Sequence, residues 1–195
     1  MRILNLFILL LNFSLFSLTA QEAINVIDTE SSTLNWVGKK ITTSQHNGSL
    51  KFLSGELTIC ANNNGSESLV CGGKFSVDMT SLLVEDLTGS SKQRLEGHLK
   101  SDDFFSVNKH KTAYLSINSS KATDSGFIAQ GSLTIKDITH PIEFKLTRSL
   151  GGFVADLVFD RSKYNVRYNS GSFFENLGDN LILDEIELTA NLYFQ

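Results

Sequence analysis

Apolar and polar residues alternate with a period of two along most of the chain, which is typical of β-strands with one buried face. About eight alternating runs occur, separated by turn residues. The apolar face of each run comprises, in order, Leu34, Trp36 and Gly38; Leu57 and Ile59; Phe75, Val77 and Met79; Ala113, Leu115 and Ile117; Phe127, Ala129, Gly131, Leu133 and Ile135; Ile142, Phe144 and Leu146; Phe153, Ala155, Leu157 and Phe159; and Ile182, Ile186, Leu188, Ala190, Leu192 and Phe194. This pattern predicts a single all-β domain.

Antiparallel strands of this number and length can close on themselves. A strand of about ten residues spans roughly 33 Å, and eight such strands form a barrel whose interior holds either packed side chains or one ligand. We therefore predict an eight-stranded antiparallel barrel with a short helical segment. The alternation leaves open whether the lumen is filled by its own side chains or partly empty.

The strongly apolar faces of the strands predict the lining of the lumen. One of these positions, Phe52, lies in a run that changes phase near Ser54–Gly55, which indicates a β-bulge. The predicted lumen residues are Leu34, Trp36, Phe52, Phe75, Val77, Met79, Leu115, Phe127, Leu133, Phe144, Phe159 and Ile186.

The segment from Thr88 to Leu99 departs from the strand pattern. Leu95 and Leu99 are one helical turn apart, and Thr88, Ser90 and Ser91 are candidate helix caps. A short turn over 101–105 is expected to follow this helix. Because 87–105 is the longest interruption of the strands, it is predicted to border one mouth of the barrel, either as a lid or as a static plug.

Composition supports the barrel and excludes some functions. The chain has 195 residues, 41% of them hydrophobic, which is enough for one domain with a sizeable core. Fourteen Phe and a single Pro favour uninterrupted strands. The formal net charge is -4 and no block of Lys or Arg occurs, so a nucleic-acid surface has no electrostatic basis.

Residues 1–20 read as a secretory signal peptide. Met1 and Arg2 precede a mostly apolar run from Ile3 to Leu18, which ends in Thr19 and Ala20. The alternative, a retained membrane anchor, is disfavoured because the run is short for a bilayer and has no basic flank on its far side. We expect residues 21–195 to form the mature domain, periplasmic or secreted, without a stable membrane anchor.

Cys60 and Cys71 flank a loop rich in Asn, Gly and Ser. Two strands that return on each other would bring the two cysteines to opposing positions in an oxidising compartment, which predicts a disulfide. The alternative is a pair of free thiols. With two Cys and four scattered histidines, His46, His98, His110 and His140, no metal site is expected.

A search for catalytic motifs finds no nucleophile elbow, zinc-protease motif, Walker loop or dinucleotide fingerprint, and no cofactor is predicted. The densest polar and aromatic cluster contains Asp160, Arg161, Tyr164, Arg167 and Tyr168. Arg161 and Tyr164 are therefore candidates to hold an anionic head group. Ordinary surface ion pairs would explain the same residues.

Seven segments of the chain, spread over roughly residues 24–192, resemble the YceI-like family in content and order. They are Trp36–Lys40, His46–Gly48, Gly73–Met79, Gly97–Val107, Gly131–Thr139, Phe159–Tyr168 and Asp184–Ile186. Lys111, where the family often has Pro, and the Cys60/Cys71 pair depart from the family pattern.

This resemblance implies a lipocalin-like barrel that binds a polyisoprenoid lipid, either a prenyl pyrophosphate or a long-tailed quinone, as a periplasmic or secreted carrier. It also implies a binding protein and no enzyme. Two alternatives stay open: a structural barrel without ligand, and an enzyme that uses Arg161 and Tyr164 with Asp78, Asp102 or Asp103 as acid or base. The sequence leaves the oligomeric state open between monomer and homodimer.

Overall fold

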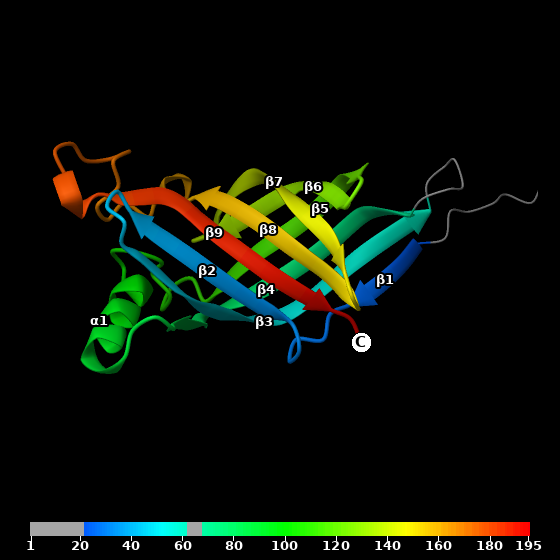
Figure 1. Cartoon of the computed structure of the whole chain (residues 1–195), viewed down its shortest axis with the longest axis horizontal. Helices are drawn as coiled ribbons and strands as arrows, with labels where there is room; N and C mark the ends of the chain where they lie inside the picture. Colours follow the sequence, from blue (N-terminus) through cyan, green and yellow to red (C-terminus); the bar gives the residue numbers. More distant parts are fainter. Residues whose placement is uncertain (1–21, 62–67) are drawn as a thin grey trace, which may run out of the picture.

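The computed structural model describes residues 22–61 and 68–195 and consists of nine strands, one α-helix and two short 3-10 helices (Figure 1). The predicted signal peptide lies outside the described residues. The elements, in chain order, are β1 (Glu22–Val26), β2 (Thr33–Lys40), β3 (Gln45–Ala61), β4 (Ser68–Val84), α1 (Gly89–Lys100), β5 (Thr112–Thr123), β6 (Gly126–Ile135), β7 (Ile138–Ser149), β8 (Gly152–Asp160), η1 (Arg161–Tyr164), η2 (Gly178–Asn180) and β9 (Ile182–Tyr193).

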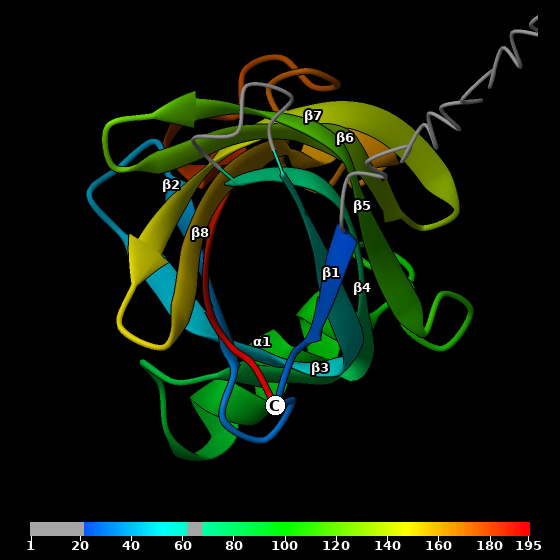
Figure 2. The ribbon, with the colours of Figure 1, turned by 90° about the vertical axis from the view of Figure 1, so that its right-hand side faces the viewer.

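Strands β2 to β9 form a closed antiparallel barrel, as predicted. Each of these strands pairs with its sequence neighbours, including β4 with β5, although the connection between those two contains α1. Strand β9 closes the ring against β2. Figure 2 shows this ring nearly end-on. Because the chain winds around the barrel in order, the inward faces of all eight strands meet in one lumen.

Strand β1 is a ninth strand that the alternation did not predict. It pairs with β3 over Glu22↔Cys60 to Val26↔Glu56, beyond the half of β3 that pairs with β2. Its apolar side chains Ile24 and Val26 are 62% and 46% exposed, so they contribute no buried face to the interior of the barrel. β1 thus extends the wall at the end of the barrel remote from α1 (Figure 1).

Strand β3 carries the predicted bulge. Its register against β4 shifts between Phe52 and Ser54, next to the predicted site. Gly55 follows, where a Cβ atom would lie 2.5 Å from the Phe75 ring and 2.7 Å from Ile27, so only glycine allows this close approach. The bulge lets β3 bend around the lumen while Phe52 stays buried.

The predicted helix forms as α1 and begins at Gly89, after Thr88, one of the three candidate caps, although the Thr88 side chain makes no capping hydrogen bond. The last residue of β4 is hydrogen-bonded to the helix, because the Glu96 carboxylate accepts a hydrogen bond of 2.9 Å from the Val84 amide. The following turn buries Phe104 and Phe105. Segment 87–105 therefore borders one end of the barrel, with Leu99, Phe104 and Phe105 buried.

Candidate functional site

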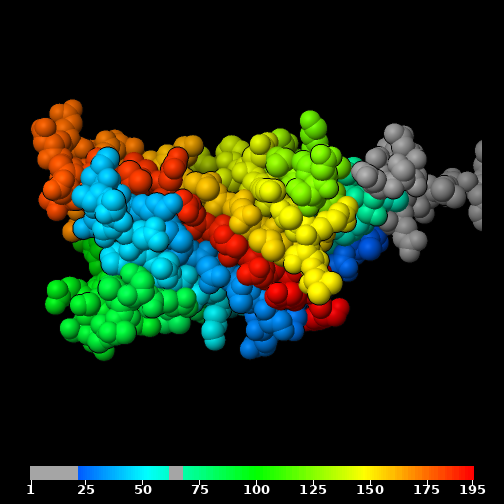
Figure 3. Space-filling model, viewed as in Figure 1, coloured from blue at the N-terminus to red at the C-terminus, as the bar shows by residue number. Residues whose placement is uncertain are grey.

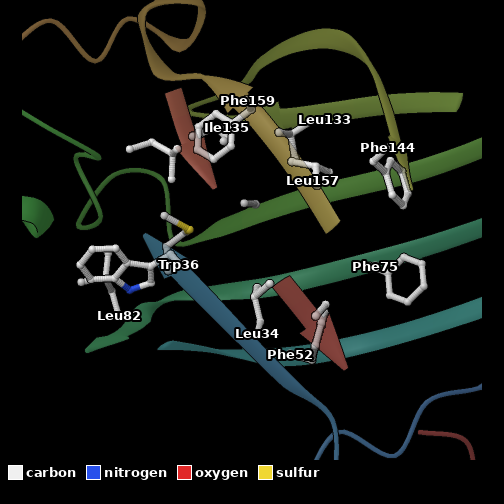
Figure 4. Close-up of a cluster of buried hydrophobic side chains, with 14 of the residues drawn as sticks. Leu34, Trp36, Phe52, Phe75, Leu82, Leu133, Ile135, Phe144, Leu157 and Phe159 are labelled. Carbon is white, nitrogen blue, oxygen red and sulfur yellow. The ribbon is translucent and has the colours of Figure 1, made fainter. Parts of the chain in front are cut away.

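The barrel encloses an apolar cavity of about 400 Å³. This volume is within the range of small-molecule binding pockets. Figure 4 shows side chains from several strands, among them Trp36, Phe75 and Phe159, converging on the same space. Strand parity explains the lining, because alternate residues of each strand point inward.

Most of the predicted lumen residues line this cavity, and most of them are buried. The predicted residues found in the lining are Leu34, Trp36, Phe52, Phe75, Val77, Met79, Leu115, Leu133, Phe144, Phe159 and Ile186. Whether they contact a ligand remains a prediction.

Phe127 is the exception among the predicted lumen residues. It points inward and is 1% exposed, yet it does not line the cavity. Its ring centroid is 6.1 Å from that of Phe153, and the Arg148 guanidinium lies 4.6 Å above the ring. Phe127 therefore belongs to the side-chain packing beyond the cavity. The prediction missed this because alternation identifies the inward face of a strand without showing how far along the barrel the empty space extends.

Buried side chains fill this end of the barrel, and β1 and the C-terminus lie at its rim (Figure 2). Ile27, Leu57 and Val70 are at most 1% exposed, and the Ile27 amide donates a hydrogen bond to the Gly55 carbonyl. The cavity thus has one filled end, which we call the closed end, defined by Ile27, Leu57, Val70 and Phe127.

The opposite end of the cavity is polar and reaches the surface. Its lining comes from the β2–β3 turn, from α1 and from the segment 165–181, which gather at the same end of the molecule in blue to cyan, green and orange (Figure 3). We call this end the mouth. Its polar lining residues are Lys39, Lys40, Ser44, Gln45, His46, His98, Tyr168, Asn169 and Asn180.

Helix α1 contributes Leu95, His98 and Leu99 to the mouth, so segment 87–105 borders the cavity as predicted. The His98 ring centroid is 4.3 Å from that of Tyr168, and its Nε2 atom is buried without a hydrogen-bond partner. The His46 ring nitrogen Nδ1 is 2.7 Å from Asp86, which ties the segment before the helix to β3.

The structure places Arg161, a predicted head-group residue, away from the cavity. Its side chain is fully buried and lies outside the cavity lining. It donates hydrogen bonds of 2.9–3.2 Å to the carbonyls of Leu183, Val166, Tyr168 and Ile182. Asp184, 3.2 Å away, balances its charge, and four of the five guanidinium donors are already used by backbone carbonyls. Burial lowers the pKa of Arg161, and the Asp184 carboxylate opposes this effect.

Tyr164 also lies outside the cavity lining. It is 2% exposed and packs edge-on against Phe159 and His140 at centroid distances of 5.7 and 5.3 Å. Burial raises its pKa to about 12. Arg161 and Tyr164 therefore stabilise the 161–168 segment, which the sequence pattern could not distinguish from a binding cluster.

The candidate acids of the enzyme hypothesis also lie away from the cavity. Asp78 accepts a hydrogen bond from the Thr80 amide, and Asp102 is exposed and 2.7 Å from the Lys109 ammonium. The hydrogen bond from Lys109 lowers the pKa of Asp102. None of Asp78, Asp102 and Asp103 lines the cavity. Within residues 22–61 and 68–195, no group of three His, Cys, Asp or Glu side chains could hold a metal.

Cys60 and Cys71 form a disulfide, which confirms that prediction, with their Cα atoms 5.9 Å apart. The bond links β3 and β4 near β1, far from the mouth (Figure 1). The helices of the described part of the chain include none that is long and apolar enough to cross a membrane.

Sequence reasoning missed two kinds of lining residue. Ile135, Leu157 and Leu188 continue alternations already recognised, so parity could have found them. The other kind, such as His98, comes from the helix, and no local signal places it in the lumen.

Comparisons with known proteins agree with this architecture. The YceI-like domain family matches residues 26–194. Burkholderia cenocepacia BcnA is similar in structure with a TM-score of 0.57 and 14% identity, over 85% of this chain and 98% of that chain. A polyisoprenoid binding domain from Saccharophagus degradans, implicated in plant cell wall breakdown, gives a TM-score of 0.53 and 12% identity, over 88% and 97%.

The Campylobacter jejuni YCEI protein is a third similar structure, with a TM-score of 0.50 and 16% identity over 74% of this chain and 84% of that chain. At these identities the structural likeness shows the barrel fold alone. No curated protein matches the chain by sequence.

Proposed function

Because the chain belongs to the YceI-like domain family, we propose that it binds a polyisoprenoid lipid, a prenyl pyrophosphate or a long-tailed quinone, in the barrel cavity. It acts as a periplasmic or secreted carrier or sequestering protein. The observation that carries the proposal is the polarity gradient of the cavity, which is apolar toward the closed end and polar at the mouth.

An amphipathic lipid fits this gradient with its tail inside and its head at the mouth. Burial of each methylene-sized group contributes about 0.8 kcal/mol, which accumulates along an isoprenoid tail. Association and immobilisation offset part of this gain. The aromatic and aliphatic lining supplies a preformed apolar surface, so little of the protein has to be ordered upon binding.

Two further observations support the carrier role. The Cys60–Cys71 disulfide is expected in an oxidising compartment, and it agrees with the signal peptide predicted for residues 1–20. The Saccharophagus degradans domain with the same fold is a polyisoprenoid-binding domain.

Binding is favoured over catalysis because the candidate acids lie outside the cavity and Arg161 is committed to backbone carbonyls. A lipid in the cavity meets aliphatic and aromatic side chains over most of its length. A reaction on the tail would need an acid or base among them.

Organic extraction of the purified protein, followed by mass spectrometry, tests the proposal. We expect an unmodified prenyl lipid in the extract. Titration of extracted protein with geranylgeraniol provides a second readout, because Trp36, the single Trp of the chain, lines the cavity and its fluorescence should change. Absence of a prenyl lipid together with an unchanged Trp36 signal would refute lipid binding, and a chemically altered lipid would favour the enzyme alternative.

A further inference from the structure

The ionisable groups that line the cavity are distributed unevenly. The whole chain has 21 acidic and 17 basic residues, yet the lining contains Lys39, Lys40, His46 and His98, with no Asp or Glu from the described part of the chain. All four lie at the mouth. An acidic protein therefore places only potential cations where the head group of a bound lipid would be.

The carboxylates nearest these groups are already paired. Glu187 forms an ion pair with Lys39 on the outside of the barrel, Asp86 pairs with His46, and Asp184 pairs with the buried Arg161. These pairs cancel the charges of Lys39 and, when protonated, His46. None of them involves Lys40.

Lys40 is the lysine of the lining that has no ion-pair partner among the described residues. It follows Leu34, Trp36 and Gly38, which line the cavity, and Lys39, which lines the mouth but is paired with Glu187. After a shift of register between Gly38 and Lys40, Lys40 pairs with Ile182 of β9, which also lines the cavity. Within residues 22–61 and 68–195, no carboxylate lies within ion-pair distance of the Lys40 ammonium.

The uncharged polar groups of the mouth can donate hydrogen bonds to an anion. Asn169 and Asn180 provide side-chain amides and Ser44 provides a hydroxyl, each of which can donate as well as accept. His98 Nε2 is buried at the same mouth without a partner, which is costly, and an acceptor oxygen satisfies it when it carries the proton. A head group rich in acceptor oxygens and negatively charged is complementary to this set.

We propose that the mouth binds an anionic prenyl lipid through its phosphate or diphosphate, and that Lys40 is the residue that selects this head group over a neutral one. This inference rests on the proposed lipid-binding function and narrows it to one of the two head-group classes. A single ammonium at the edge of an apolar cavity is screened less than one on an open surface, so its charge discriminates between heads that share a tail.

The test compares two probes with the same tail, geranylgeranyl diphosphate and geranylgeraniol, by quenching of Trp36 fluorescence. The wild-type protein should bind the diphosphate about tenfold more tightly than the alcohol. Lys40→Met keeps the length of the side chain without the charge and should bring the two affinities to about the same value, whereas Lys40→Arg should retain the preference. High ionic strength should reduce the wild-type preference.

Lys74→Met is the matched control, because Lys74 is exposed on β4 and lies outside the cavity lining. It should bind both probes like the wild type. Should Lys40→Met fail to fold by circular dichroism, Lys40→Gln makes the same comparison. Equal affinity of the wild-type protein for both probes, or an unchanged preference in the folded Lys40 variant, would overturn the inference. Because geranylgeraniol has no charge, its binding reports the proposed function separately, and failure to bind either probe would refute that function itself.

Discussion

Arg161 shows how a single buried cation can organise a segment of chain. Its donors join the carbonyls of residues 166 and 168 to those of β9, so the loop after η1 is fixed to the barrel wall. The Phe104 ring lies 5.4 Å from the guanidinium carbon, which extends this contact to the turn after α1. The residue therefore shapes the mouth without contacting the cavity.

Replacement of Arg161 should be strongly destabilising. Arg161→Met leaves four carbonyls, all at least partly buried, without their donor and Asp184 without its counter-charge, and we expect a loss of about 3–5 kcal/mol in the free energy of unfolding. Denaturant unfolding measures it. Arg94→Met, on the exposed face of α1, is the control and should change stability by less than about 0.5 kcal/mol. Similar stabilities of the two variants would contradict the structural role of Arg161.

Phe144 tests the lumen at the scale of one side chain. Phe144→Asp places an unpaired carboxylate in the apolar cavity, which costs several kcal/mol when a tail occupies it, so a folded variant should retain no lipid after purification. Extraction and mass spectrometry give the readout. Val158→Asp, at a half-exposed position of β8 outside the lining, should retain lipid like the wild type. Retention by folded Phe144→Asp would exclude Phe144 from the binding surface.

At the scale of elements, the helix and the turn after it are held differently. The Lys136 ammonium donates hydrogen bonds to the carbonyls of Phe104 and Asn165, at 3.0 and 2.9 Å, which fixes the turn over 101–105. Helix α1 is mostly exposed, and Leu99 is its single buried residue. Elements with few buried contacts open most easily.

Hydrogen exchange distinguishes whether segment 87–105 acts as a lid or as a static plug. If α1 opens to admit the lipid, amides of α1 should exchange more slowly in loaded protein than in extracted protein, while amides of 101–105 stay equally protected in both. Amides of β6, far from α1, serve as the internal reference. Equal protection of α1 in the two states would identify the whole of 87–105 as a static plug.

The disulfide is an element-scale constraint on the β3–β4 hairpin. The intact mass of exported protein should be lower than that of reduced protein by the two thiol hydrogens. The replacement of both cysteines by Ser should cost at most about 3 kcal/mol of stability and leave lipid affinity unchanged, because the bond lies far from the mouth. A large loss of affinity in the folded double variant would contradict this separation.

At the scale of the whole molecule, the barrel was predictable and the ends were not. Alternation fixes which side of a strand is buried, so Leu34, Phe75 and Leu133 could be placed inside from the sequence. Phe127 has the same parity, but whether it lines or closes the cavity depends on residues 100 positions away in sequence, such as Ile27. The position of Arg161 outside the lining could not be predicted, because local sequence cannot show which carbonyls surround a guanidinium.

The closed end has a kinetic consequence. A ligand that enters tail-first through a single opening must leave by the same route. A second lipid therefore cannot enter the barrel and displace the bound one until the bound one has dissociated. The dissociation rate of a bound prenyl lipid should therefore be independent of the concentration of competing lipid, as stopped-flow Trp36 fluorescence can measure. Acceleration by competitor would reveal a second passage through the region of Ile27, Leu57, Val70 and Phe127.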